Sequence, residues 1–117
     1  MPESIQLEDK SKAIKRLTDK LTKEMLWVYI LRLLQERPLY GYEIKHLITQ
    51  RFAFSPATVS GYAIIYRLIR DNLIEAQMGG DSRRKYYAIT EDGRQAMKEA
   101  KDFLERTLGT VFDLTEL

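Results

Sequence analysis

The residue types that carry most enzyme chemistry are scarce in this chain. It contains no cysteine and a single histidine, His46. This composition excludes disulfide scaffolds, Cys/His zinc sites, cysteine nucleophiles and any catalytic triad that needs more than one imidazole. The sequence also shows no phosphate-binding loop, paired carboxylates or activated nucleophile. We therefore expect a protein that is not an enzyme and that uses no metal and no cofactor.

The chemistry that remains is the binding of anions by cations and tyrosines. Residues 1–90 carry 15 Lys/Arg against 10 Asp/Glu, a net charge of +5, whereas residues 91–117 carry 4 against 7, a net charge of −3. A basic body favours a polyanionic partner, and an acidic tail favours a different role for the last segment. The candidate binding residues form three groups: Tyr42 and Lys45; Ser60, Tyr62, Tyr66 and Arg67; and Arg83, Arg84 and Lys85.

The length and hydropathy of the chain limit the structures that can position these residues. Its 117 residues make one ordinary domain, since domains commonly have roughly 100 to 150 residues. The longest apolar run, Met25 to Leu31, is far shorter than the stretch of about 20 residues that spans a bilayer. The amino terminus has no apolar core of the kind found in secretory signals. We expect a soluble, cytoplasmic protein with no membrane association.

Residues 11–23 predict a short amphipathic helix. Ile14, Leu17 and Leu21 recur at spacings of three and four in an otherwise cationic stretch. Its basic outer face fits either a solvated surface or an arm that contacts phosphates.

The next segment predicts a helix that is apolar on every side. It runs from about Met25 to Leu34 and ends before Pro38. One small domain cannot cover such a helix completely, so part of its surface should meet a second subunit. Trp27 belongs either to this contact or to the ordinary core.

Two more helices are expected in close succession. The first begins near Gly41 and turns Tyr42 and Lys45 away from its apolar stripe. The second should start with Ser55 as N-cap and Pro56 at the first helical position, and run to about Asp71. On this second helix the outward residues are Ser60, Tyr66 and Arg67, with Tyr62 on the flank. Gly61 within it predicts a close approach to the preceding helix, because glycine costs about 1 kcal/mol there relative to alanine.

The remaining segments predict a β-hairpin and a long final helix. Residues 73–78 and 85–89 form the strands around a Gly79-Gly80-Asp81 turn. The cations beside the turn either face an anion or protect a sheet edge. Thr90 should cap the final helix, whose apolar stripe over about six turns is too long for the small core it would cover. We expect a dimer interface made by Trp27 and by five residues of this helix: Phe103, Leu104, Leu108, Val111 and Phe112.

The order of the elements predicts a mainly α protein with a small β-hairpin, arranged as a winged helix-turn-helix. The expected division is a basic extension helix at residues 1–21, the winged domain at 22–90 and a dimerisation helix at 91–117. In such a fold the helix expected from Ser55 to about Asp71 fits a major groove about 12 Å wide, and the hairpin reaches the adjoining DNA backbone or minor groove.

Three segments also resemble the PadR family of transcriptional regulators: LWVYILRLLQERPLYGYEI (26–44), YAIIYRLIRDNLI (62–74) and RRKYYAITEDGRQAM (83–97). The resemblance covers about residues 22–108. It implies that Tyr42 touches the DNA backbone, that Tyr62 lies on the DNA-facing side of the recognition helix, and that Arg83, Arg84 and Lys85 belong to the wing. It also implies a homodimer in which the last helix packs on the first family helix of the other subunit. The segment Thr58 to Ala63 departs from the family pattern, so the resemblance does not assign the base-reading residues.

We expect a homodimeric, sequence-specific regulator that binds double-stranded DNA. A repressor is favoured because the chain shows no separate domain for recruiting polymerase. The resemblance also makes a small aromatic or hydrophobic ligand a candidate partner, with Trp27, Tyr29 and Phe103 as its site, although core packing explains these three as well. Two alternatives remain open: an architectural DNA-binding protein without sequence preference, and a winged-helix module that binds another protein.

Overall fold

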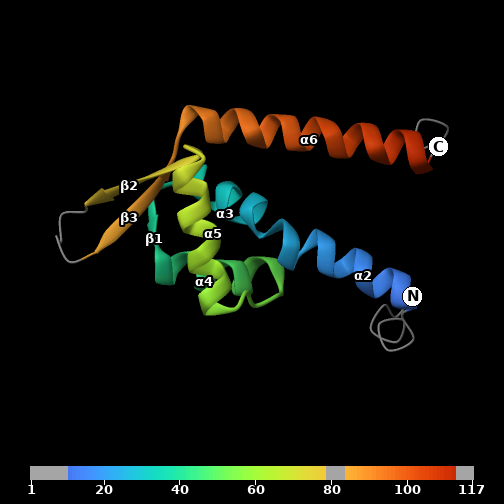
Figure 1. The fold of residues 1–117 in the computed structure, drawn as a ribbon, viewed down its shortest axis with the longest axis horizontal. Coiled ribbons are helices and arrows are strands. Elements are labelled where there is room, and N and C mark those ends of the chain that lie inside the picture. The colour runs from blue at the N-terminus through green and yellow to red at the C-terminus, as the bar shows by residue number, and fades with distance from the viewer. Residues whose placement is uncertain (1–10, 79–83, 113–117) are drawn as a thin grey trace.

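A computed structural model describes residues 11–78 and 84–112, apart from the side chains of residues 58–60. Along the chain lie α2 (Lys12–Leu21), a 3-10 turn η1 (Lys23–Met25), α3 (Leu26–Leu34), β1 (Leu39–Tyr40), α4 (Gly41–Phe52), α5 (Thr58–Arg70), β2 (Ile74–Met78), β3 (Lys85–Ile89) and α6 (Glu91–Phe112). Three helices and the sheet form a body from which α2 and α6 project in the same direction (Figure 1). This architecture confirms the predicted winged helix-turn-helix.

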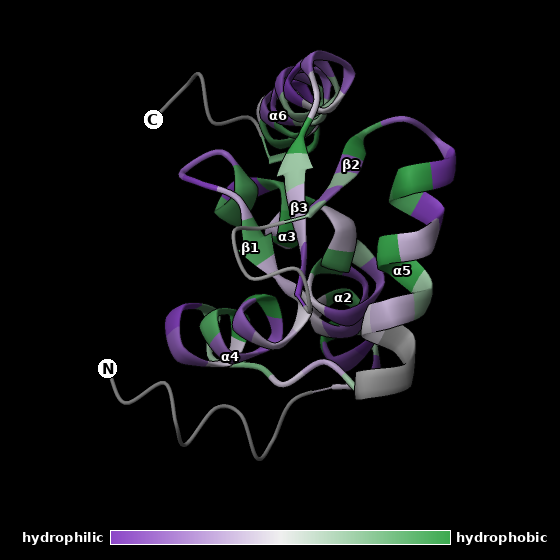
Figure 2. Ribbon diagram, turned by 90° about the vertical axis from the view of Figure 1, so that its left-hand side faces the viewer, coloured by the Kyte–Doolittle hydropathy of each residue, from purple (hydrophilic) through white to green (hydrophobic). Residues whose placement is uncertain are grey.

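The core is built around α3, which the other elements surround (Figure 2). Its side chains Ile30, Leu31 and Leu33 are at most 1% exposed. From α4, Ile44 and Ile48 are buried against it, and further buried side chains come from α5 and the sheet. A single chain thus buries most of the apolar surface of α3, more than the sequence led us to expect, and leaves residues 27–29 half-buried. The contact of this helix with a second subunit stays a prediction.

The wing is a three-stranded antiparallel sheet in the order β1-β3-β2. Ile74 pairs with Ile89 at its base and Met78 with Lys85 toward its tip. The two long strands were predicted, but β1 was not, because two residues are too few to show an alternating pattern. The predicted Gly79-Gly80-Asp81 turn and Arg83 lie outside the described residues.

The start predicted for α5, with Ser55 as N-cap and Pro56 as first helical residue, was wrong by two residues. Ala57, in an extended conformation, is the N-cap of α5, and the amide of Gly61 donates to its carbonyl oxygen at 2.8 Å. Pro56 is buried. The Ser55 hydroxyl lies 3.3 Å from the Thr49 hydroxyl of α4 instead of capping α5. Proline and serine here belong to the connection between helices, whose path is set by the core beneath it.

The predicted role of Gly61 was also wrong. A Cβ atom at this position would meet nothing within 4 Å, so no neighbouring helix requires a glycine here. The close approach lies at Gly41, the first residue of α4, where a Cβ would come within 2.9 Å of the Tyr62 ring.

The junction between the wing and α6 was predicted correctly. The Thr90 hydroxyl accepts a hydrogen bond from the amide of Gly93 at 3.0 Å and donates to the carbonyl oxygen of Asn72 at 2.7 Å. Asn72 ends the α5 region in a left-handed conformation with φ of 63°, which asparagine tolerates. Within the described part of the chain, no helix is long and apolar enough to cross a membrane.

Candidate nucleic-acid interface

The amino-terminal turn of α4 presents the first group of predicted binding residues. Glu43 fixes this turn, because one of its carboxylate oxygens accepts from the amide of Tyr40 at 3.2 Å and the other lies 3.5 Å from the Arg37 guanidinium. Tyr42 then points outward with 66% of its surface exposed. Its ring stacks on His46 one turn later, with centroids 6.0 Å apart. A phenol held this way can donate to a phosphate oxygen.

The outward face of α5 carries the second group. Tyr66 is 60% exposed and Arg67 is also exposed. The inner side of the helix is fixed by Ile65 and Leu68, each 3% exposed. Anchoring on one side leaves the other able to enter a groove. Ser60 lies in the first turn of α5, and the structure describes its backbone only.

Tyr62 connects α5 to α4. It is 42% exposed, and its ring rests against Gly41, where any larger residue would collide with it. The hydroxyl therefore lies next to the start of α4, near Tyr42. The glycine that allows this contact is part of the Tyr40-Gly41-Tyr42 sequence, but only the three-dimensional arrangement reveals its purpose.

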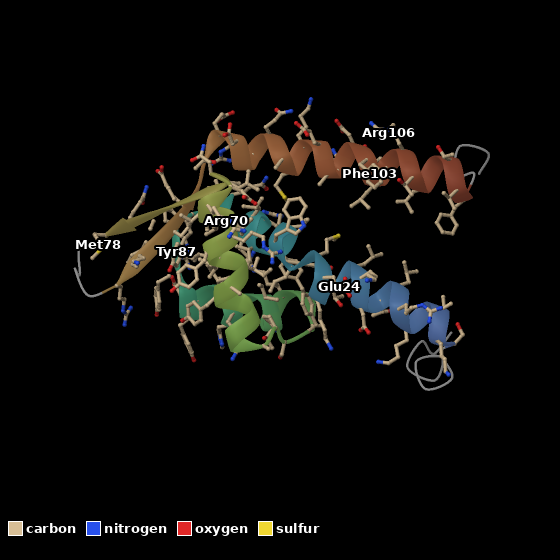
Figure 3. All side chains as sticks on the ribbon, viewed as in Figure 1. Glu24, Arg70, Met78, Tyr87, Phe103 and Arg106 are labelled. Carbon is tan, nitrogen blue, oxygen red and sulfur yellow. The ribbon has the colours of Figure 1, made fainter. Side chains whose placement is uncertain are left out.

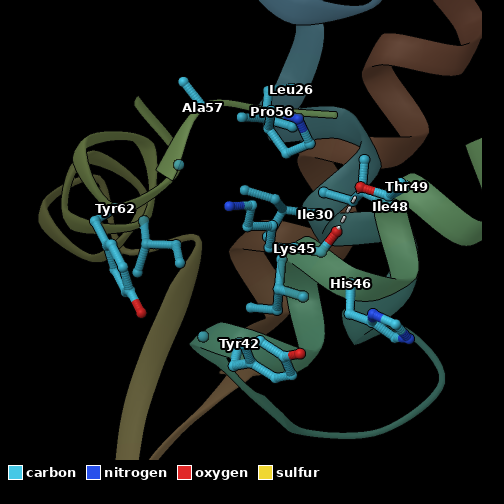
Figure 4. A pocket seen from close by; sticks show the side chains of 14 residues that line it. Leu26, Ile30, Tyr42, Lys45, His46, Ile48, Thr49, Pro56, Ala57 and Tyr62 are labelled. Carbon is cyan, nitrogen blue, oxygen red and sulfur yellow. Dashed lines mark hydrogen bonds between the residues drawn. The ribbon is translucent and has the colours of Figure 1, made fainter. Parts of the chain in front are cut away.

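A cavity of about 490 Å³ lies between α4 and α5. In Figure 4, Tyr62 approaches it from α5, while Tyr42, Lys45 and His46 come from α4. Its floor is apolar and includes Ile30. This cavity thus brings together three predicted binding residues from two helices, Tyr42 and Lys45 of α4 and Tyr62 of α5.

The wing contributes the third group and a residue that the sequence did not single out. The Arg84 guanidinium lies 4.4 Å from the centroid of the Tyr40 ring, a cation–π contact. Tyr40 also packs edge-on against Tyr86, with centroids 5.6 Å apart. Tyr40 thereby ties the wing to the start of α4. Lys85 is exposed at the beginning of β3, and Arg83 lies outside the described residues.

Tyrosine hydroxyls also gather between α5 and the sheet. Burial raises the pKa of Tyr87 above its ordinary value, and the neighbouring Tyr66 and Tyr62 add to this effect. Tyr87 is 5% exposed and lies on the sheet next to α5 (Figure 3). It therefore remains a neutral phenol at physiological pH. The face formed by α4, α5 and β3 combines tyrosine side chains with the cations of Lys45, Arg67 and Lys85.

Four of the six predicted dimer residues are exposed in the single chain, and the other two are half-buried. On α6, the exposed fractions are 59% for Phe103, 44% for Leu108, 65% for Val111 and 62% for Phe112, and Leu104 is half-buried. Trp27 is half-buried against the core. None of these six residues is placed in the cavity between α4 and α5.

Tyr29, named with Trp27 and Phe103 as a candidate ligand contact, is committed to packing. Its ring meets Phe52 and Phe54 edge-on, each at 5.0 Å between centroids. Its hydroxyl donates to the carbonyl oxygen of Leu21 at 2.6 Å. Among the described residues, no three His, Cys, Asp or Glu side chains are grouped closely enough to hold a metal ion.

Comparison with known proteins identifies the family of this chain. The sequence model of the Transcriptional regulator PadR-like family matches residues 30–99, more than half of the chain. An uncharacterised protein of Lysinibacillus sphaericus is 42% identical over 77 residues, covering 60% of this chain and 69% of that protein.

Solved structures agree. A transcriptional regulator from Clostridium thermocellum superposes with a TM-score of 0.67 at 28% identity, over 74% of this chain and 89% of that one. A PadR-like transcriptional regulator from Bacillus cereus does so with a TM-score of 0.63 at 30% identity, over 80% and 94%.

Proposed function

The chain belongs to the PadR-like family of transcriptional regulators, and from this premise we propose that it is a homodimeric, sequence-specific repressor of transcription that binds double-stranded DNA. Membership identifies a DNA-binding regulator. The dimer, the repression, the contacting residues and the division into residues 1–21, 22–90 and 91–117 are the proposed parts.

One observation carries the proposal: the exposed face of α5 is flanked by binding groups from α4 and from the wing. Tyr66 and Arg67 are exposed on a helix whose opposite side is buried, which is the geometry of a recognition helix. We assign base contacts to Ser60, Tyr66 and Arg67. Arg67 is the residue suited to a bidentate contact with guanine.

The neighbouring groups have a different role. Tyr42, Lys45, Tyr62 and the wing cations Arg83, Arg84 and Lys85 are assigned to phosphates. Such contacts fix the register of the protein on the duplex and supply salt-dependent affinity, but they carry little sequence information. Two copies related by a twofold axis would then recognise half-sites about one helical turn apart, in a palindrome. A dimer that covers two adjacent major grooves blocks access to the DNA beneath it, which is why we propose repression.

A small aromatic or hydrophobic effector is the remaining part of the proposal. Trp27 is the only tryptophan and is half-buried on α3, one of the two helices that should form the dimer interface. Quenching of its fluorescence across a panel of flat aromatic compounds would support such a site. A flat response across the panel would remove the effector from the proposal.

Selection of the preferred duplex from a random pool, followed by binding titrations, tests the main proposal. The selected duplex should be a palindrome that binds at least about a thousandfold more tightly than random DNA. Equal affinity for both would instead identify an architectural DNA-binding protein. Glutamate substitution of Arg83, Arg84 and Lys85 should abolish DNA binding, whereas a protein contact made through α5 would largely survive it and would identify a winged-helix protein-interaction module.

A further inference from the structure

Helix α2 leaves its apolar stripe uncovered. Ile14, Leu17 and Leu21 are 45%, 50% and 41% exposed, and no residue of α2 is buried. This helix precedes the family match, which begins at residue 30. Three aliphatic side chains aligned on one face of a helix are costly to leave in water, so the stripe calls for an occupant.

The helix is held in place and does not fold back onto its own core. The Tyr29 hydroxyl of α3 donates to the carbonyl oxygen of Leu21 at 2.6 Å. Lys20 pairs with Glu24 at 2.8 Å across the bend between the helices. Both bonds fix the direction in which α2 leaves the body, and that direction is also the one taken by α6 (Figure 1).

The length of α6 points to the occupant. Its 22 residues extend about 33 Å at 1.5 Å per residue, whereas the nine residues of α3 extend only about 14 Å. A partner's α6 that packs on α3 alone would leave more than half of its length unsupported. The stretch Lys12–Leu34, formed by α2, η1 and α3, has 23 residues and matches α6 in length.

Charge and exposed area agree with this match. Residues 10–23 carry six Lys/Arg and one Asp, whereas residues 91–117 carry a net charge of −3. Phe103 projects from the edge of α6 that faces α2 (Figure 3). The three α2 residues and the exposed apolar residues of α6 are each 41–65% exposed, so both helices offer apolar surface that an interface could bury.

We propose that the apolar stripe of α2 is a second half of the dimer interface, and that α6 of a second copy packs along α3 and continues onto α2. This inference rests on the homodimer of the proposed function. It adds to that dimer a helix that the family match does not include. The basic outer face of α2 then stays at the rim of the interface.

Cysteine cross-linking tests the contact directly, because the chain has no cysteine of its own. Chains carrying Leu17→Cys are mixed with differently tagged chains carrying a cysteine at Leu104, Leu108 or Val111, and are then oxidised. At least one pair should give an intermolecular disulfide between the two tags. Arg16→Cys, on the opposite face of α2, should give none. A further variant carries Leu17→Cys and the α6 cysteine in the same chain. If it forms a disulfide within one chain while no mixed pair cross-links, α2 meets its own α6 and the proposal is overturned.

A dissociation measurement separates this inference from the proposed function. By sedimentation, Leu17→Gln should weaken the dimer at least tenfold, since the substitution is repeated in both copies. Arg16→Gln should change it less than about threefold. A monomeric wild-type chain would overturn the proposed homodimer itself. A wild-type dimer that Leu17→Gln leaves unchanged, with helix content preserved by circular dichroism, would overturn only the role of α2.

Discussion

The glycine at position 93 is predicted to be indispensable to the junction between the wing and α6. A Cβ atom on Gly93 would overlap the carbonyl oxygen of Leu73 and come within 2.7 Å of Ile89 Cγ1. The Ile89 side chain can turn away, but the Leu73 carbonyl is backbone and accepts a hydrogen bond from the Thr90 amide at 3.1 Å. Relief of the overlap therefore requires that this bond be stretched or broken.

The expected cost follows from these contacts. Overpacking in a tight site costs typically about 1–3 kcal/mol, and a weakened backbone hydrogen bond adds about 1 kcal/mol. Alanine returns up to about 1 kcal/mol through its higher helix propensity. Gly93→Ala should therefore lower the free energy of unfolding by about 1–3 kcal/mol, a substantial part of the 5–15 kcal/mol typical of a domain. Urea unfolding at one fixed protein concentration measures it, because dimerisation would make the stability depend on concentration.

Gly61→Ala is the matched control, since this glycine is also helical but its Cβ would meet nothing within 4 Å. It should stabilise the protein by roughly 0.5–1 kcal/mol through helix propensity alone. Equal effects of the two substitutions would refute the reasoning, because only the overlap with Leu73 distinguishes them. Should Gly61→Ala destabilise instead, α5 would have to contact something that the described chain does not show.

Three further predictions concern DNA binding, pH and backbone strain. Arg67→Ala should cost about 1–3 kcal/mol of affinity for the selected duplex and relax the preference at one base pair, whereas Arg94→Ala on α6 should have little effect; fluorescence anisotropy measures both. The hydrogen bond from Arg51 at 2.8 Å holds the pKa of Glu36 below its ordinary value of 4.5, so this pair stabilises the fold above that pH and the benefit is lost as the pH falls through the lowered value. Glu36→Gln should thus be less stable than the wild type at pH 7, with a difference that shrinks below pH 4.5 in urea titrations; a constant difference would contradict this. Ala53 ends α4 with φ of 63°, so Ala53→Gly should raise the thermal midpoint modestly, by the equivalent of about 0.5–1 kcal/mol, and a lowered midpoint would show that the strain is absent.

Features with local causes could be predicted from the sequence. The strand Lys85–Ile89 and the cap at Thr90 appear as expected, because an alternating pattern and a capping hydroxyl act over a few neighbouring residues. The same holds for the first helix, whose cap is the Ser11 hydroxyl, 3.2 Å from the amide of Ile14. This helix forms although none of its residues is buried.

Features that depend on distant neighbours were missed. Pro56 resembles a helix start in sequence, but it is buried and α5 begins after it. A glycine carries no mark of its neighbours, so Gly61 and Gly41 could not be distinguished until Tyr62 was placed. The same limit applies to Tyr40, whose contact with Arg84 joins residues 44 positions apart.

In the candidate binding site, too, local features could be predicted and features that depend on distant neighbours could not. Sequence patterning identified which faces of α4 and α5 point outward, because outward faces are set by the helical period. It did not show that Tyr42, Lys45 and Tyr62 meet at one cavity, since that depends on the angle between two helices.

The junction at Gly93 links the two halves of the proposed function. α5 is the proposed DNA-reading helix and α6 is the proposed dimer contact. Three residues separate α5 from β2, and one residue separates β3 from α6. Thr90 donates hydrogen bonds to the carbonyl oxygens of Asn72 and Leu73, and its hydroxyl accepts one from the amide of Gly93, so it holds the start of α6 against the end of the α5 region. A change in how α6 packs on α3 of the second subunit would therefore be transmitted to the separation between the two α5 helices. Because half-sites lie at a fixed spacing along the duplex, a rigid junction converts dimer geometry into DNA affinity. Any effector that acts at the dimer interface needs this rigidity, and Gly93→Ala should weaken operator binding by more than its loss of stability alone would explain.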